Sequence, residues 1–253
     1  MKIKKELWSN TMYHIFIILM GFLMLYPVLW VIMSSFKIHS NALSPSLIPK
    51  VFTLNNYIQG WKGFGDFSFS TFFKNSFIVA IVASLGQTIL SACTAYGFAR
   101  IKFIGRNTWF GIMILTLLLP KQVLMLPQYL LFNKLGLINS LWPLILPQFF
   151  PLPFFVFLMI QFIKGIPMEL DEAAQIDGCN TYSIFFRIIL PNIKPALITV
   201  FIFSFYWTWQ DFLSPLLYIQ SAKLYTVPLA LQMFSDPMTM TSWGAIFAMS
   251  TFS

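Results

Sequence analysis

The chain has 253 residues, of which 58% are hydrophobic, 18% aromatic and only 9% charged. Because a soluble domain carries roughly a quarter charged residues, this composition excludes an ordinary soluble enzyme or binding domain and indicates a membrane protein. The net charge of +8 is interpreted as a signal of membrane orientation, and not of nucleic-acid binding, because the chain consists of long apolar segments.

Five segments are long and apolar enough to cross a bilayer, which takes about 20 helical residues. They are residues 12–34, 74–99, 108–131, 142–163 and 195–219. A sixth apolar segment begins near Trp243 and stops at Ser253, and we expect it to be the start of a truncated sixth span. The predicted fold is therefore all-α and polytopic, with one transmembrane domain over residues 1–253.

The amino terminus, MKIKKELWSN, is basic and leads into an apolar run longer than the core of a cleaved signal peptide, so it predicts a retained first span. Alternate loops, starting with this terminus, hold nine of the 16 basic residues in short stretches. The other seven, Lys121 among them, lie in the longer loops. This density predicts a cytoplasmic amino terminus and outward-facing loops at residues 35–73 and 220–242.

The second span carries small and hydroxylated residues at helical spacing on one stripe: Ala80, Ser84, Gln87 or Thr88, and Ser91. Such residues let membrane helices approach and bond to each other. The same stripe is also suited to line a polar pathway, and both interpretations stay open.

The fourth span contains four prolines, at positions 143, 147, 151 and 153, with Gln148 among them. Interior prolines remove helix hydrogen bonds and force kinks or breaks. Breaks within a membrane are tolerated only where protein or a water-filled cavity satisfies the backbone. The span is expected to bend, either beside a cavity or only to fit its neighbours.

Residues 169–191, within a predicted loop at 164–194, form the longest polar interruption of the chain and hold four of its eight carboxylates: Glu169, Asp171, Glu172 and Asp177. Pro167 suits the first turn of a helix and Gly178 its end, so a helix of about ten residues is predicted. Acidic residues in the first turn are favoured by the helix dipole. Ala173, Ala174 and Gly178 are expected to form a small-residue face that another surface can approach.

The fifth span contains Trp207, Gln210 and Asp211, and Asp211 is the only acid within a predicted span. Buried carboxylates in membranes are costly and usually functional. Its position near the outer end of the span also suits a structural role beside an aromatic belt. We name Gln87, Gln148, Trp207, Gln210 and Asp211 as candidate substrate-pathway residues.

The acidic segment resembles a known signature, the cytoplasmic EAA loop of permease subunits of binding-protein-dependent ABC importers. The matching positions are Glu172, Ala173, Ala174, Gly178, Ile188, Leu190 and Pro191, with Asp177 also common in the pattern. Further similarity to the sugar-permease branch, and to the shorter permease subunit of maltose-type systems, lies in FTLNNY at 52–57, AYGFAR at 95–100 and WTWQDFLSPLL at 207–217.

The resemblance implies a type I importer permease with about six spans, in the bacterial plasma (inner) membrane. It implies that residues 164–194, with Glu169 and the matching positions, couple the spans to a cytoplasmic ABC ATPase dimer. The other implied partners are a second permease subunit, forming a heterodimer, and an extracytoplasmic solute-binding protein that contacts residues 220–242. Lipid surrounds the spans.

The chain is not expected to be an enzyme or to hold a cofactor or metal. It has no phosphate-loop motif, so ATP and Mg are expected on the partner ATPase. Cys93 and Cys179 define neither a disulfide framework nor a metal site. The alternatives are a permease for another small solute, or a secondary transporter or channel. The few titratable residues in the spans and the lack of a clear internal repeat disfavour the latter.

Overall fold

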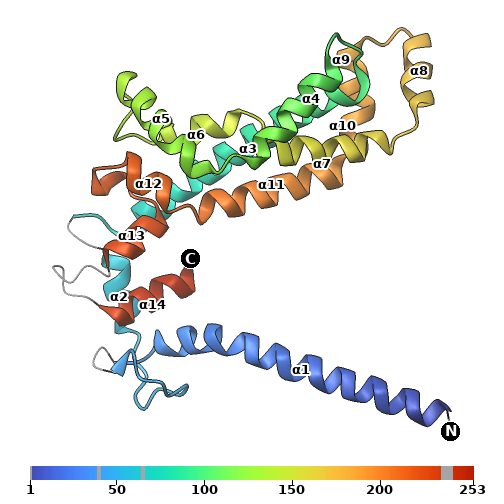
Figure 1. The fold of residues 1–253 in the computed structure, drawn as a ribbon. Helices are drawn as coiled ribbons and strands as arrows, with labels where there is room; N and C mark the ends of the chain where they lie inside the picture. Colours follow the sequence, from blue (N-terminus) through green and yellow to red (C-terminus); the bar gives the residue numbers. More distant parts are fainter. Residues whose placement is uncertain (1, 39–40, 64–65, 235–241) are drawn as a thin grey trace. The chain divides into compact units, whose positions relative to one another are not determined.

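The computed structural model describes residues 2–38, 41–63, 66–234 and 242–253, with side chains from Thr11 onward, and most of these residues lie in helices, with no strand among them (Figure 1). Residues 235–241, which are part of the predicted last outward loop at 220–242, lie outside the described residues. The chain divides into two compact units, one of residues 1–70 with 230–253 and one of residues 71–229.

The first unit is built on the first span and two shorter helices. These helices are α1 (Lys2–Ser34), α2 (Asn55–Lys62) and α14 (Trp243–Phe252). The buried Asn56 amide donates to the carbonyls of Ser35 and Lys37, each at 2.7 Å, and ties α2 to the end of α1. Gly60 leaves room for Met249 of α14, whose Cγ lies 2.8 Å from where a Cβ would stand. The described part of the predicted loop at residues 35–73 thus contains a helix of its own, α2, and the loop ends earlier than predicted, since the next long helix begins at Phe69.

The second unit holds the other spans and the acidic loop. Its elements are α3 (Phe69–Arg100), α4 (Arg106–Leu115), η2 (Thr116–Leu118), α5 (Lys121–Lys134), α6 (Trp142–Ile145), η3 (Leu146–Phe149), α7 (Pro153–Lys164), α8 (Met168–Ile176), α9 (Thr181–Ile184), the π-helical turn η4 (Phe185–Ile189), α10 (Leu190–Asn192), α11 (Lys194–Trp209), α12 (Leu213–Tyr218), η5 (Ala222–Leu224) and α13 (Val227–Met233). The boundaries between the units fall within α3, after residue 70, and within α13, after residue 229. A buried apolar core joins α3, α7, α8, α9 and α11, and α7 and α11 run side by side (Figure 1).

Three helical segments in the described chain are long and apolar enough to cross a membrane by themselves: Thr11–Ser34, Phe69–Arg100 and Trp142–Lys164. They confirm the predicted first, second and fourth spans. Two bent helix pairs raise the number to five if each counts as one span.

The third predicted span, 108–131, is not one continuous helix. Its two parts, Arg106–Leu118 and Lys121–Lys134, meet at an angle of 98°. Leu119 is extended, with φ −80° and ψ 118°, because a residue before proline is pushed out of the helical region. Pro120 is extended as well. The segment predicted as the third span is therefore apolar enough to cross a membrane, but it is broken at this dipeptide.

The fifth predicted span, 195–219, was too long. The helix α11 ends at Trp209 and α12 begins at Leu213. Pro215 explains the break, because its ring would clash with the carbonyl of Asp211 in a continuous helix. Asp211 therefore lies in the connection between two helices and not within a transmembrane helix.

Candidate functional site

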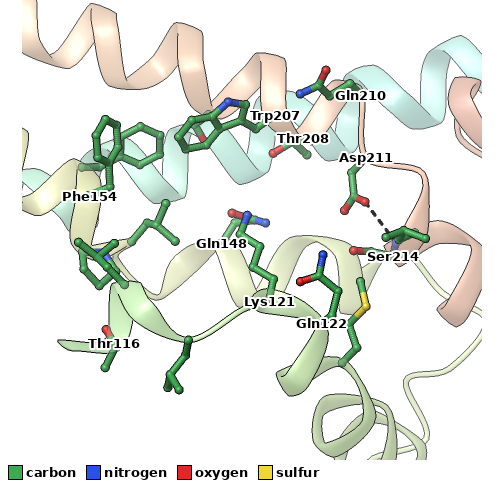
Figure 2. A pocket seen from close by; sticks show the side chains of 18 of the residues that line it. Thr116, Lys121, Gln122, Gln148, Phe154, Trp207, Thr208, Gln210, Asp211 and Ser214 are labelled. Carbon is green, nitrogen blue, oxygen red and sulfur yellow. Dashed lines mark hydrogen bonds between the residues drawn. The ribbon is translucent and has the colours of Figure 1, made fainter. Parts of the chain in front are cut away.

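A cavity of about 750 Å³ opens in the second unit, where the α4–α5 bend, the fourth span and the end of α11 meet (Figure 2). Polar side chains from all three segments line it: Thr116, Lys121, Gln122, Gln148, Ser204, Thr208, Gln210, Asp211 and Ser214. Apolar groups, including Phe154, Phe155 and Trp207, cover much of the remaining wall. The cavity thus combines aromatic faces with many hydrogen-bonding groups.

The five residues predicted for the substrate pathway lie together in space. Gln148, Trp207, Gln210 and Asp211 line the large cavity. Gln87 lines a smaller cavity of about 210 Å³ that also includes Gln148 and Asp211. Residues separated by more than 120 positions in the chain therefore surround one region.

Gln87 has a definite structural role beside this region. Its side chain is 1% exposed, and the amide orientation that fits its neighbours lets its oxygen accept from the Leu152 N–H at 2.6 Å. In the same orientation its nitrogen donates to the Gln148 carbonyl at 3.0 Å. Both partners belong to the proline-rich break of the fourth span, so α3 supplies the backbone bonds that the prolines remove. The predicted stripe on the second span is buried as well, as its packing interpretation predicts: Ala80, Ser84 and Ser91 are each fully buried.

Trp207 presents one ring to the cavity. It stacks on Phe155, with ring centroids 5.1 Å apart and planes at 24°. The Lys121 Nζ lies 5.9 Å from its ring centre, within cation–π distance. Trp209 instead packs against Phe77 of α3, at 4.8 Å. Of the two tryptophans, only Trp207 is therefore a cavity residue.

Lys121 is a cavity residue that sequence reasoning missed, because it counted only as a basic residue of an outward loop. It begins α5 directly after Pro120, and Figure 2 shows its side chain reaching into the cavity near Gln148. The signal was present, since a lysine after a proline inside an apolar run marks a break where a polar group can face a cavity.

Asp211 caps the helix that follows it. Its Oδ1 accepts a hydrogen bond from the Ser214 N–H at 3.2 Å (Figure 2). A carboxylate at this position satisfies an end-of-helix N–H group and is favoured by the helix dipole. Asp211 therefore has a structural partner and a place on the cavity wall at the same time.

The acidic loop contains the predicted helix, α8, over Met168–Ile176, with Pro167 directly before it. Gly178 has φ +81°, the left-handed conformation that glycine adopts without a penalty. The Cys179 N–H bonds to the Ala174 carbonyl at 2.9 Å and the Gly178 N–H to the Gln175 carbonyl at 3.0 Å. These two bonds form a Schellman motif, so the helix ends where the sequence predicted.

The faces of α8 differ from the predicted small-residue face. Ala174 is 7% exposed and packs into the core of this chain, so it is not available to another surface. Glu169, Glu172, Ala173, Asp177 and Gly178 are exposed, as is Pro191, while Ile188 and Leu190 are half-buried. The α-helical spacing places positions 171 and 174 on the inner face. The outer face therefore carries Glu169, Glu172, Ala173 and the exposed Ile176.

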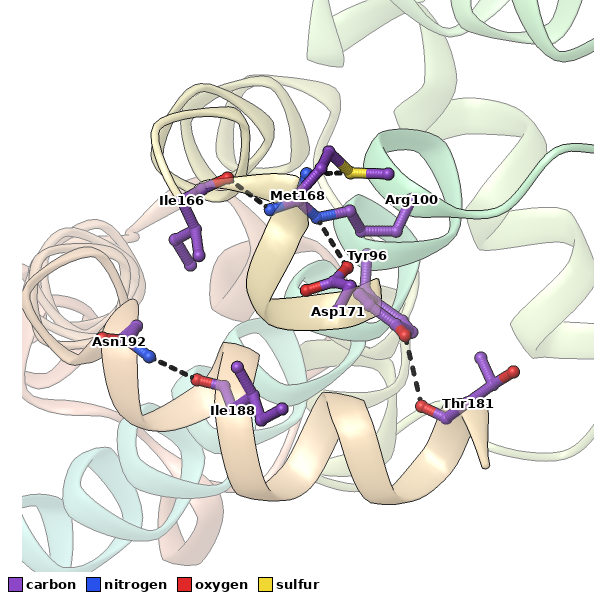
Figure 3. Close-up of polar contacts among 8 residues, drawn as sticks. All are labelled: Tyr96, Arg100, Ile166, Met168, Asp171, Thr181, Ile188 and Asn192. Carbon is purple, nitrogen blue, oxygen red and sulfur yellow. Dashed lines mark hydrogen bonds and ion pairs between the residues drawn. The ribbon is translucent and has the colours of Figure 1, made fainter. Parts of the chain in front are cut away.

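The inner face of α8 holds an ion pair that the sequence did not predict. The Arg100 Nε lies 3.1 Å from the Asp171 Oδ2, and both side chains are 6% exposed. The same guanidinium donates through Nη2 to the Ile166 carbonyl at 2.6 Å. After the end of α8 in the chain, the Thr181 carbonyl accepts a hydrogen bond from the Tyr96 hydroxyl at 3.2 Å (Figure 3). Arg100 and Tyr96 lie in the AYGFAR motif, but a motif does not reveal its partner.

Comparison with known proteins identifies similar chains. A family model described as binding-protein-dependent transport system inner membrane component matches residues 87–253. The probable ABC transporter permease protein YurM of Bacillus subtilis is 34% identical over 97% of this chain and 81% of its own length. The arabinooligosaccharides transport system permease protein AraQ of Halalkalibacterium halodurans is 34% identical over 91% of this chain and 82% of its own.

A solved structure has the same fold. It is a chain from a bacterial ABC transporter involved in the import of the acidic polysaccharide alginate, with a TM-score of 0.82 and 18% identity. The match covers 96% of this chain and 90% of that one. The architecture is therefore the type I importer permease fold.

Proposed function

Because this chain belongs to the binding-protein-dependent transport system inner membrane component family, we propose that it forms half of the pathway of an ATP-driven carbohydrate importer. Such a subunit is a multi-pass inner-membrane protein whose ATPase is a separate subunit and which works with a binding protein. Family membership decides against a stand-alone secondary transporter or channel.

The cavity is the observation that carries the carbohydrate proposal. Sugar rings have apolar C–H faces and polar rims, and the stacked ring of Trp207 is surrounded by Gln148, Thr208 and Gln210. A site of this kind offers an aromatic face together with convergent polar groups. The related AraQ protein is named for arabinooligosaccharides, which supports an oligosaccharide as the substrate class.

The acidic loop is proposed as the contact with the ATPase dimer. Its outer surface combines Glu169, Glu172 and Asp177 with the exposed apolar side chains of Ile176 and Tyr182, at 86% and 77% exposure. Charged groups at the rim of an apolar patch are typical of a protein interface. Closure of the ATPase on ATP and Mg, both bound by the partner, would move α8 and shift the spans between two states.

The remaining features of the assembly follow from the same proposal. A second permease subunit supplies the other half of the pathway, and the amino terminus and residues 164–194 face the cytoplasm. The described side chains of the first span are exposed almost throughout, from Thr11 to Leu29, and are covered by lipid or by the partner permease. Residues 220–242 face the binding protein, and no cofactor is held by this chain.

Uptake of labelled oligosaccharide by cells that depend on this importer tests the substrate class. We expect Trp207→Phe to retain most of the uptake and Trp207→Ala to reduce it at least tenfold, because phenylalanine keeps an aromatic face. Equal uptake by both variants and wild type would remove the cavity from the pathway.

Co-purification tests the coupling loop. We expect Glu172→Lys to lose the ATPase while keeping the second permease, because the substitution reverses charge on the exposed face. The matched control is Asp66→Lys, the same reversal at an exposed position outside the loop. If wild type brings down no ATPase, the coupling assignment fails.

A further inference from the structure

We propose that α3 is the element that transmits movement of the acidic loop to the cavity, and that Arg100 is the positioning residue at its loop end. This inference rests on the proposed coupling of residues 164–194 to the ATPase. It assigns the connection to a helix that is distant from the loop in sequence, in addition to α7 and α11, which flank the loop directly.

One side chain of α3 holds the start of the loop at three points. The Arg100 guanidinium pairs with Asp171, donates to the Ile166 carbonyl and contacts the Met168 sulfur at 2.6 Å (Figure 3). A planar guanidinium presents its donors in a rigid fork, so these three groups are held in one arrangement. The pair is also shielded from water, with 6% of each side chain exposed, and shielding strengthens the contact between charges.

The end of the loop is held by the same helix. Tyr96, one turn before Arg100, donates to the carbonyl of Thr181, the first residue of α9. One set of contacts is therefore at the start of α8, and the other follows its end in the chain. Because α8 has only nine residues, it cannot move far relative to α3 without breaking one of them.

The other contact of α3 is at the cavity. Gln87 bonds to Gln148 and Leu152 in the break of the fourth span, and Gln148 and Leu152 both line the large cavity. Arg100 lies thirteen positions after Gln87, which is about 20 Å of helix. The whole of α3 is one α-helix of 32 residues, so displacement at one contact is carried to the other with little bending.

The break in the fourth span is the part of the cavity wall that α3 is proposed to displace. Leu152 is extended, at φ −69° and ψ 127°, and its backbone is the joint between η3 and α7. A joint of this kind can adopt different angles at low cost, whereas packed helices cannot. The helix α3 therefore connects the acidic loop, through Gln87, to the break in the fourth span.

The test is Arg100→Lys in the complete complex, with the partner permease, the ATPase and the binding protein. Lysine keeps the positive charge but not the fork. We expect unchanged ATPase content, an unchanged basal rate and an unchanged half-saturating concentration of loaded binding protein. The maximal stimulated ATPase rate is expected to fall about fivefold or more. The control is Arg187→Lys, since Arg187 is an exposed arginine of the same loop.

A second variant separates transmission from folding. Arg100→Met combined with Asp171→Leu removes both charges, so neither is left buried and unpaired, which is the usual cause of a folding defect. We expect this complex to assemble and to show the same loss of maximal stimulation. Full stimulation of the double variant, or of Arg100→Lys, would overturn the inference, as would a loss that only follows a loss of bound ATPase.

The outcomes also separate this inference from the proposed function. A wild-type complex that binds no ATPase contradicts the coupling role of the loop itself. A wild-type complex that is stimulated normally, with variants that behave like it, contradicts only the role of α3 and Arg100.

Discussion

Gly178→Ala should loosen the end of α8 by a purely conformational effect. Gly178 has φ +81°, and a Cβ built there meets nothing within 4 Å. The substitution therefore creates no clash, and its cost is the strain of an L-residue in the left-handed region, about 1–2 kcal/mol. The strained residue also carries one of the two Schellman bonds, from Gly178 to Gln175, and its neighbour carries the other, from Cys179 to Ala174.

Hydrogen exchange of the Gly178 and Cys179 amides in the assembled complex measures this effect directly. A cost of about 1–2 kcal/mol corresponds to exchange roughly five- to thirtyfold faster. The matched control is Gly111→Ala, in the helix α4, where a Cβ also meets nothing within 4 Å. Gly111→Ala should leave unchanged or slow the exchange of the amides around it in α4, because alanine favours helix. Unchanged exchange at residues 178 and 179 in Gly178→Ala would refute the argument.

Three further predictions concern the cavity and the loop beside it. Gln87→Leu should destabilise the purified complex by about 2–4 kcal/mol in a thermal melt, because the Leu152 and Gln148 backbone groups lose their partner. The control Thr88→Val, at a buried hydroxyl without a partner, should leave the melting temperature unchanged, and equal melting temperatures of the two variants would contradict this. Asp211→Asn should keep the hydrogen bond to the Ser214 N–H and the melting temperature but change the uptake rate, whereas Asp211→Ala should lower both the melting temperature and the uptake rate. A normal uptake rate for Asp211→Asn would limit Asp211 to capping. Asn139 has φ +61°, and its Oδ1 accepts hydrogen bonds from the Gln220 and Ser221 amides. Both Asn139→Ala and Asn139→Gly lose these bonds, but only alanine is strained at this φ, so Asn139→Ala should lower the melting temperature more. The reverse order would be inconsistent with this account.

The acidic loop was the part most fully predicted from sequence, because its determinants are local. Pro167 and Gly178 act on their own backbone dihedrals, so the start and end of α8 follow from single residues. The position of Glu169 and Asp171 in the first turn of α8 was predicted in the same way. The orientation of the helix did not, since the burial of Asp171 and Ala174 depends on Arg100 and on the core beneath.

The breaks in the third and fifth spans were missed although their signals are local too. Pro120 and Pro215 act as the prolines of the fourth span do, but neither belongs to a dense cluster of prolines, and Pro127, in the same predicted span as Pro120, stays inside the helix α5. A single proline is compatible with a kinked continuous helix. What decides between a kink and a full break is whether tertiary structure supplies partners for the released backbone, and that information is not local.

The breaks have a common location, which explains why the membrane part of the protein contains so many. The α4–α5 bend brings Lys121 to the cavity, the fourth-span break brings Gln148 and Leu152, and the end of α11 brings Gln210 and Asp211. Irregular backbone at membrane depth is stable only where protein or water satisfies its polar groups. Three breaks around one space therefore support each other, because the cavity can hydrate the backbone that each exposes. The same breaks turn polar side chains inward from helices that are otherwise apolar, so a water-filled pathway can form without charged residues in the middle of any helix.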